Sequence, residues 1–118
     1  LMEAGLVDLV GGTASIAPGV RAALTSAHAP GHQVLWVQDG AEVLFCPVEI
    51  LPDTHHLRLA WAMAFDDMPV HVVEVKRSLL PTAAAAGWTV FLSHEMGPPF
   101  GRLHPDGPEA FRFEPLDA

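Results

Sequence analysis

The stretch "TSAHAPGHQVLWVQDGAEVLFCPVE", Thr25–Glu49, decides the fold. Its two apolar runs, 33–37 and 41–48, flank Asp39-Gly40. Asp-Gly between two such runs is a strong signal for a β-hairpin. Both runs are apolar at nearly every position, which is typical of strands that are buried on both faces. We therefore predict two paired strands inside a layered structure.

On the N-terminal side of this hairpin we expect further strands. "ASIA" at 14–17 and "VRAALTS" at 20–26 are strand-like and are separated by a Pro18-Gly19 turn. Before them, residues 1–6 are predicted to form the tail of a helix, and "LVDLV" at 6–10 a short strand that ends at Gly11-Gly12.

On the C-terminal side the pattern changes. Residues 49–69 predict an irregular segment with one or two helical turns, and a helix begins at Pro69. Pro81 is expected to end or kink this helix, and Gly87 to close a last turn. "WTVFL" at 88–92 predicts a strand, and two short strands follow around the 105–107 turn. This order predicts a mixed α/β (α+β layered) fold with one main helix.

Composition excludes several classes of function. The 118 residues contain 14 acidic and 6 basic side chains, for a net charge of −8, so we expect no nucleic-acid or anionic-membrane partner. No apolar run is long enough to span a bilayer. Cys46 is the single cysteine, lies in an apolar run and fits a reducing compartment, so we expect a buried small residue in a cytoplasmic protein.

Polar residues with metal-binding chemistry follow three predicted strands. His28 follows one strand, Glu49 a second and His94 a third. Two imidazoles and a carboxylate make a partial ligand shell for zinc, iron or manganese. By spacing alone, scattered loop histidines remain the alternative interpretation.

The other histidines divide by context. His32 follows His28 by four residues across Ala-Pro-Gly. His55 and His56 are adjacent, so they point in different directions, and we expect one of them to line a pocket. His71 is expected to be a partly buried structural residue of the helix, and His104 to be exposed beside a turn.

Read together, these segments resemble the C-terminal half of a metallo-β-lactamase-fold hydrolase. "AHAPGH" stands where the family carries G-H-T-P-G-H, and "VEILPDTHHL" stands in its A-D-x-x-P frame with Glu49 at the acid position. "HLRLAWAMAFDDMP" follows one branch of the family closely. A Lys76-Arg77 pair and "GWTVFLSHEM" then follow in the family's order.

The resemblance implies an αββα sandwich, of which residues 1–118 are the C-terminal half, and hydrolysis of an ester, lactone, thioester or similar bond by metal-activated water. It implies that His28 and His94 each bind one of two metal ions, that Glu49 bridges them, and that His32 supports a ligand or holds its loop. A register with Cys46-Pro47 at the family's usual Gly-Asp pair is the alternative, and it leaves no bridging acid.

The sequence also departs from the family. The H-x-H-x-D-H motif of the N-terminal half is absent, Glu replaces the bridging Asp, and Ala29 replaces the Thr that follows the first His. We therefore expect this chain alone to be inactive: either the N-terminal half is missing from the sequence, or the chain is a non-catalytic half-domain that dimerises or binds a ligand. In both cases an exposed apolar sheet face is expected, and a homodimer is one way to cover it.

Overall fold

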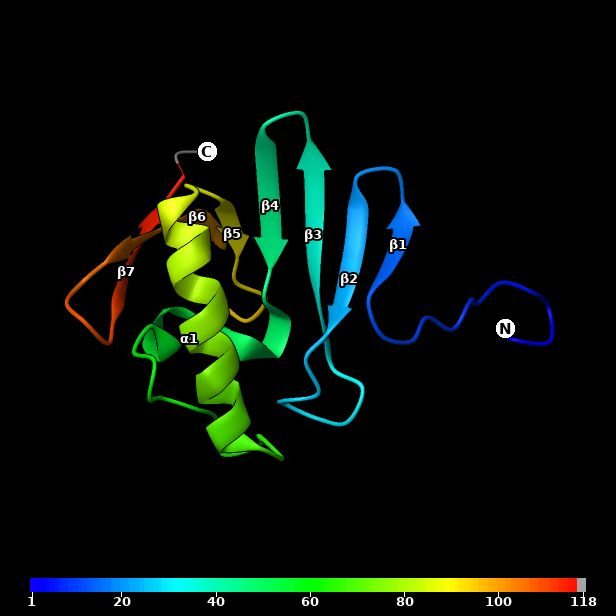
Figure 1. The fold of residues 1–118 in the computed structure, drawn as a ribbon, viewed down its shortest axis with the longest axis horizontal. Coiled ribbons are helices and arrows are strands. Elements are labelled where there is room, and N and C mark those ends of the chain that lie inside the picture. The colour runs from blue at the N-terminus through cyan, green and yellow to red at the C-terminus, as the bar shows by residue number, and fades with distance from the viewer. Residues whose placement is uncertain (117–118) are drawn as a thin grey trace.

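One seven-stranded sheet and one long helix make up the protein (Figure 1). The computed structural model describes residues 1–116. The strands lie in sequence order across the sheet, and their bounds are β1 Ala14–Ala17, β2 Val20–Leu24, β3 Gln33–Asp39, β4 Glu42–Cys46, β5 Thr89–Phe91, β6 Phe100–Pro105 and β7 Phe111–Pro115.

The sheet is mixed because one connection is a helical crossover. Each strand from β1 through β4 is antiparallel to the next, and so is each strand from β5 through β7. β4 and β5 are parallel, and the chain passes from one to the other through α1, Pro69–Ala85. Two 3₁₀ turns, η1 Val48–Ile50 and η2 Thr54–His56, interrupt the segment before α1. The predicted α+β fold with one main helix is confirmed.

The core lies between α1 and one face of the sheet. Every fourth residue of the helix is buried there, because 3.6 residues complete one turn. Neighbouring strands supply side chains from the same face, and Trp36 stacks on Phe45 with ring centroids 5.2 Å apart. The buried residues include Val72, Lys76, Leu80 and Ala83 from α1, and Val34, Phe45, Val90 and Leu103 from the strands.

The opposite face of the sheet is uncovered in the described residues. α1 packs against β6, and β1–β3 stand to one side of it (Figure 1). On the far face Leu35 and Val37 of β3 stay 37% and 40% exposed, and Phe100 of β6 is 42% exposed. The run 33–37 in β3 is apolar on both faces, but the prediction that both of its faces are buried is wrong within residues 1–116, where only one face is covered.

The helix and the strand predicted for residues 1–10 are wrong. Residues 1–10 form neither a helix nor a strand, because no neighbouring strand pairs with this apolar run and Leu9 remains 78% exposed. Pro81 does not end α1, which continues to Ala85. Pro81 lies on the exposed side of the helix, where solvent can reach the Arg77 carbonyl that a proline cannot pair with.

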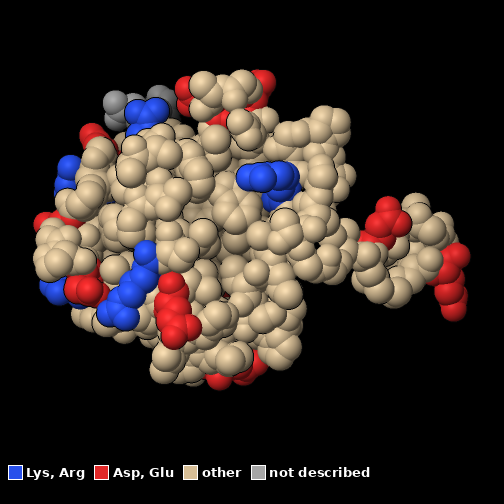
Figure 2. All heavy atoms as spheres, in the orientation of Figure 1, with Lys and Arg blue, Asp and Glu red and all other residues tan. Residues whose placement is uncertain are grey.

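Two surface features complete the description. Among residues 1–116, no helix is long and apolar enough to cross a membrane. On the face of the molecule that Figure 2 shows, acidic and basic side chains are interspersed, and the described residues on that face form no continuous basic patch.

Candidate metal centre

His28, Glu49 and His94 line one cavity of about 350 Å³ at an edge of the sheet. They follow β2, β4 and β5, respectively. β2 and β4 are both antiparallel to β3, and β5 is parallel to β4, so these three strands point in the same direction. The loops after their carboxyl ends therefore meet at one edge, which is how residues far apart in the sequence come together.

His28 is held by a buried carboxylate. Its Nδ1 lies 2.9 Å from Asp66 Oδ1, and the Asp66 side chain is fully buried. Because a carboxylate only accepts hydrogen bonds, Nδ1 donates, and Nε2 is the nitrogen left for a ligand. The backbone supports this arrangement, since the Asp67 N–H donates to the His28 carbonyl at 2.9 Å.

Glu49 and His94 contact each other across the cavity. His94 Nε2 donates to Glu49 Oε1 at 2.7 Å, and the His94 side chain is 56% exposed. The His94 N–H donates to the Pro52 carbonyl at 2.9 Å, which ties the loop after β5 to the segment after β4. Val48, just before Glu49, has a φ of 52°, a conformation that glycine adopts readily and β-branched residues rarely do.

His32 holds the loop that carries His28. Its carbonyl accepts the N–H groups of Thr25 at 2.8 Å and Ser26 at 3.1 Å, and its Nδ1 lies 2.6 Å from the Thr25 hydroxyl. Its Nε2 is buried and has no hydrogen-bond partner within residues 1–116. Burial, with the nearby His28 adding to the effect, lowers the pKa of His32 and favours the neutral ring.

Neither of the adjacent histidines, His55 and His56, lines this cavity. Asp53 lines it instead and also caps η2: its Oδ1 accepts the His55 N–H at 2.8 Å and lies 2.7 Å from His56 Nδ1. Burial acts to raise the pKa of Asp53, but these two hydrogen bonds outweigh it and lower the pKa. His56 thus contacts a residue of the cavity lining without lining the cavity itself, and the His55 side chain is 85% exposed.

Four lining residues have no counterpart among the predicted site residues. They are Pro52, Asp53, Met63 and Phe65, and Phe65 is 83% exposed. The supporting carboxylate of Asp66 was not predicted either. The one indication in the sequence was "AFDDMP", which matches a family pattern with an Asp after an aromatic residue. That pattern does not tell which side chain the Asp contacts.

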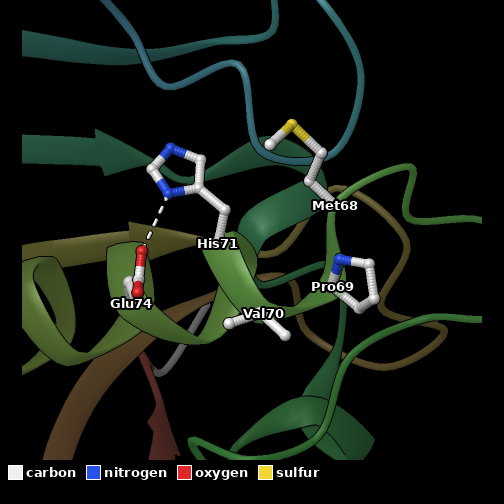
Figure 3. A pocket seen from close by; sticks show the side chains of 5 residues that line it. All are labelled: Met68, Pro69, Val70, His71 and Glu74. Carbon is white, nitrogen blue, oxygen red and sulfur yellow. Dashed lines mark hydrogen bonds and ion pairs between the residues drawn. The ribbon is translucent and has the colours of Figure 1, made fainter.

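A second hollow, of about 410 Å³, lies at the start of α1 (Figure 3). It is lined by Met68, Pro69, Val70, His71 and Glu74. His71 Nδ1 faces Glu74 Oε2 at 3.1 Å, and its Nε2 faces the Thr25 carbonyl at 3.0 Å. Both partners are acceptors, so the imidazolium form fits this position. None of the predicted metal ligands reaches this hollow.

The donor types around the first cavity suit zinc, but the donor number does not. Zinc takes four ligands from imidazole, thiolate and carboxylate groups. Within residues 1–116, no group of three or more His, Cys, Asp or Glu side chains is arranged to hold an ion. Glu49 and His94 satisfy each other, and His28 is paired with Asp66, so the described residues do not form a complete metal centre.

Known structures resemble this fold, although no protein-family model and no curated protein matches the sequence. A probable metal-dependent hydrolase from Staphylococcus aureus matches with a TM-score of 0.83 at 17% identity, over 98% of this chain and 42% of that protein. AidC, a dizinc quorum-quenching lactonase, matches with a TM-score of 0.78 at 19% identity, over 89% of this chain and 36% of its own.

A third structure, the hydrolase AbOPH of the beta-lactamase superfamily, matches with a TM-score of 0.77 at 20% identity, over 88% of this chain and 36% of its own. The chain spans less than half the length of each of these proteins. It therefore has the fold of part of the metal-dependent hydrolases of the β-lactamase superfamily.

Proposed function

We propose that this chain is one part of a metal-dependent hydrolase and contributes His28, Glu49 and His94 to its metal centre. The observation that carries the proposal is their convergence on one cavity from three loops at one edge of the sheet. Residues outside the described chain complete the ligand shell. Zinc is the ion that the imidazole and carboxylate donors favour, with iron or manganese as alternatives.

The backbone at Val48 supports Glu49 as the acid of the centre. The family's usual pair at this point is Gly-Asp, and Val48 is in the left-handed region that favours glycine. This supports assigning the Val48-Glu49 pair to the Gly-Asp position rather than the register in which Cys46-Pro47 stands there.

The reaction we propose is hydrolysis of an ester, a lactone, a thioester or a similar bond of a small molecule. Enzymes of this kind use a water molecule whose pKa a bound cation lowers toward neutral. The cavity combines polar groups with the apolar side chains of Met63 and Phe65, so it offers an apolar surface beside the polar groups.

Zinc titration of the purified chain tests the ligand assignment, with binding read from NMR shifts of the histidine rings. His28→Ala, Glu49→Ala and His94→Ala should each weaken zinc binding at least about tenfold. Loss of a residue that only supports a metal ligand already has an effect of about this size, so loss of a ligand should have at least the same effect. His55→Ala is the matched control, since that ring faces solvent, and should leave binding unchanged. Equal zinc binding by all four variants would refute the assignment.

A non-catalytic half-domain that dimerises is the second candidate function, favoured by the uncovered apolar face that includes Leu35, Val37 and Phe100. A second copy of the chain seated on this face removes these side chains from water. Light scattering after size-exclusion chromatography measures the mass, and Val37→Asp should turn a dimer into a monomer. A monomeric wild-type chain at micromolar concentration contradicts this candidate.

A further inference from the structure

Lys76 is a buried charge in the middle of the apolar stripe of α1. It is 0% exposed, and its neighbours along the stripe are Val72 and Leu80. Lys76 forms no ion pair within residues 1–116. Burying an ammonium group costs several kcal/mol unless hydrogen bonds replace its water. An aliphatic residue would fill this helix position without that cost, so the ammonium group needs another explanation.

The ammonium group is fully satisfied by backbone oxygens of one irregular segment. Nζ donates to the carbonyls of His56 at 2.6 Å, Arg58 at 2.7 Å and Trp61 at 2.7 Å. An ammonium group has three N–H donors, and each of them has its own acceptor. Lys76 therefore fastens residues 56–61 to α1 through three carbonyls, of which that of Arg58 also accepts the Trp61 N–H at 3.1 Å within the segment.

The fastened segment leads directly to the cavity. Met63 follows Trp61 by two residues and lines the cavity. Its N–H donates to Asp66 Oδ2 at 2.6 Å, and the other oxygen of Asp66 accepts from His28 Nδ1 at 2.9 Å. A continuous path of covalent and hydrogen bonds thus runs from Lys76 to the imidazole.

Arg58 and Leu59, in the first half of residues 56–61, are also held by contacts that do not involve Lys76. Leu59 N–H donates to the Glu109 carbonyl at 2.9 Å, and Arg58 forms an isolated β-bridge with Ala110. The Trp61 carbonyl, at the end nearer the cavity, is held by Lys76. Loss of the ammonium group is therefore felt most on the side of Met63 and Asp66.

We propose that Lys76 is a positioning residue of the cavity: by fixing residues 56–61, it lets Asp66 hold His28 with Nδ1 protonated and Nε2 free for a ligand. The importance of that nitrogen rests on the proposed function, in which His28 binds metal. The positioning itself is a property of the metal-free chain.

The test is the tautomer of His28, read from long-range ¹H–¹⁵N NMR spectra without metal at a pH where the ring is neutral. The wild-type chain should show the Nδ1–H form. Lys76→Met should populate the Nε2–H form and raise the amide exchange rate of Met63 at least about tenfold, while core amides such as that of Val90 keep their protection. Asp66→Ala should produce the same change in the His28 ring.

Arg77→Met is the matched control, because Arg77 is adjacent to Lys76 but exposed and paired with Glu109 at 3.1 Å. It should leave the His28 tautomer and the Met63 exchange rate unchanged. If Lys76→Met does not fold, Lys76→Gln keeps two N–H donors on a shorter arm and should give a smaller shift in the same direction.

A folded Lys76 variant with the wild-type tautomer and exchange rate would overturn the proposal. Failure of the proposed function looks different: zinc binding would then be the same in wild type and His28→Ala, although the tautomer still responds to Lys76.

Discussion

The titration of Lys76 should stabilise this protein as the pH is raised from 7.5 to 10.5. Burial lowers the pKa of Lys76 to about 8 in the folded chain, against 10.5 for an ordinary lysine, while the charge of Asp66 partly opposes the shift. Between these two values the unfolded chain binds more protons than the folded chain. The unfolding free energy therefore rises with pH across this window.

The size of the effect follows from the shift in pKa. A difference of about 2.5 units at about 1.4 kcal/mol per unit corresponds to a gain of about 3 kcal/mol once the window has been crossed. The conversion applies because the side chain is completely buried.

Cys46 titrates in the same range with the opposite sign. Burial raises the pKa of its thiol, so the folded chain keeps that proton longer, and stability falls as the pH rises through 9. The measurement is therefore made in a Cys46→Ala background, with and without Lys76→Met, by urea unfolding followed through tryptophan fluorescence.

The expected result is a rise of about 3 kcal/mol in the Cys46→Ala protein and a flat profile once Lys76→Met is added. A flat or falling profile in the first protein would refute the reasoning. An equal rise in both proteins would assign the effect to another group.

Three further predictions concern single positions. Gly101→Ala should destabilise the fold by about 1–3 kcal/mol, because its Cβ would lie 2.5 Å from a backbone oxygen of β7, whereas Gly11→Ala, with nothing within 4 Å, should be nearly neutral in urea unfolding. Val48→Gly should be more stable than Val48→Ala by about 1 kcal/mol, because only Ala keeps a Cβ at positive φ. Hydrogen bonds to Glu74 and to a backbone carbonyl raise the pKa of His71, so its contribution to stability is present below pH 6.5 and is lost as the pH rises through the raised value; Glu74→Gln should lower that pKa in an NMR titration.

Strand pairing was predictable wherever a local turn decides it. Asp39-Gly40 and the Pro18-Gly19 turn each join neighbouring strands, and both hairpins form as the sequence predicts. The run at 6–10 has the same apolar character but no partner strand among residues 1–116, so it stays outside the sheet. An apolar pattern predicts a strand only where another strand is within reach of its hydrogen bonds.

The positions of the predicted ligands could be inferred from the sequence, because each ligand follows a strand. The positions of the groups that support them could not. His28, Glu49 and His94 each follow a strand, and the directions of those strands bring them to one edge. Lys76 and Asp66 act through contacts with loops that have no periodic pattern. Their positions depend on how an irregular segment packs, which local sequence does not encode.

His55 and His56 also show that local contacts are hard to predict from sequence. Two adjacent histidines suggested a pocket, but the Asp53 carboxylate caps η2 by accepting the His55 N–H, and it also contacts His56 Nδ1. The acid lines the cavity, and the imidazoles do not. A short polar side chain before a helical turn has a local hydrogen-bonding role that competes with any site at the same place.

The two sides of the cavity differ in how firmly they are held, and this bears on what completes the site. His28 rests on a fully buried carboxylate that a buried ammonium group helps to position. His94 is more than half exposed, and Glu49 is the side chain that it contacts. In the proposed function, an incoming ion would therefore meet one prearranged imidazole and one pair that has to separate before it can bind. If the proposal holds, the His28 side binds metal with little change in structure, and the Glu49–His94 hydrogen bond breaks when the second side is occupied.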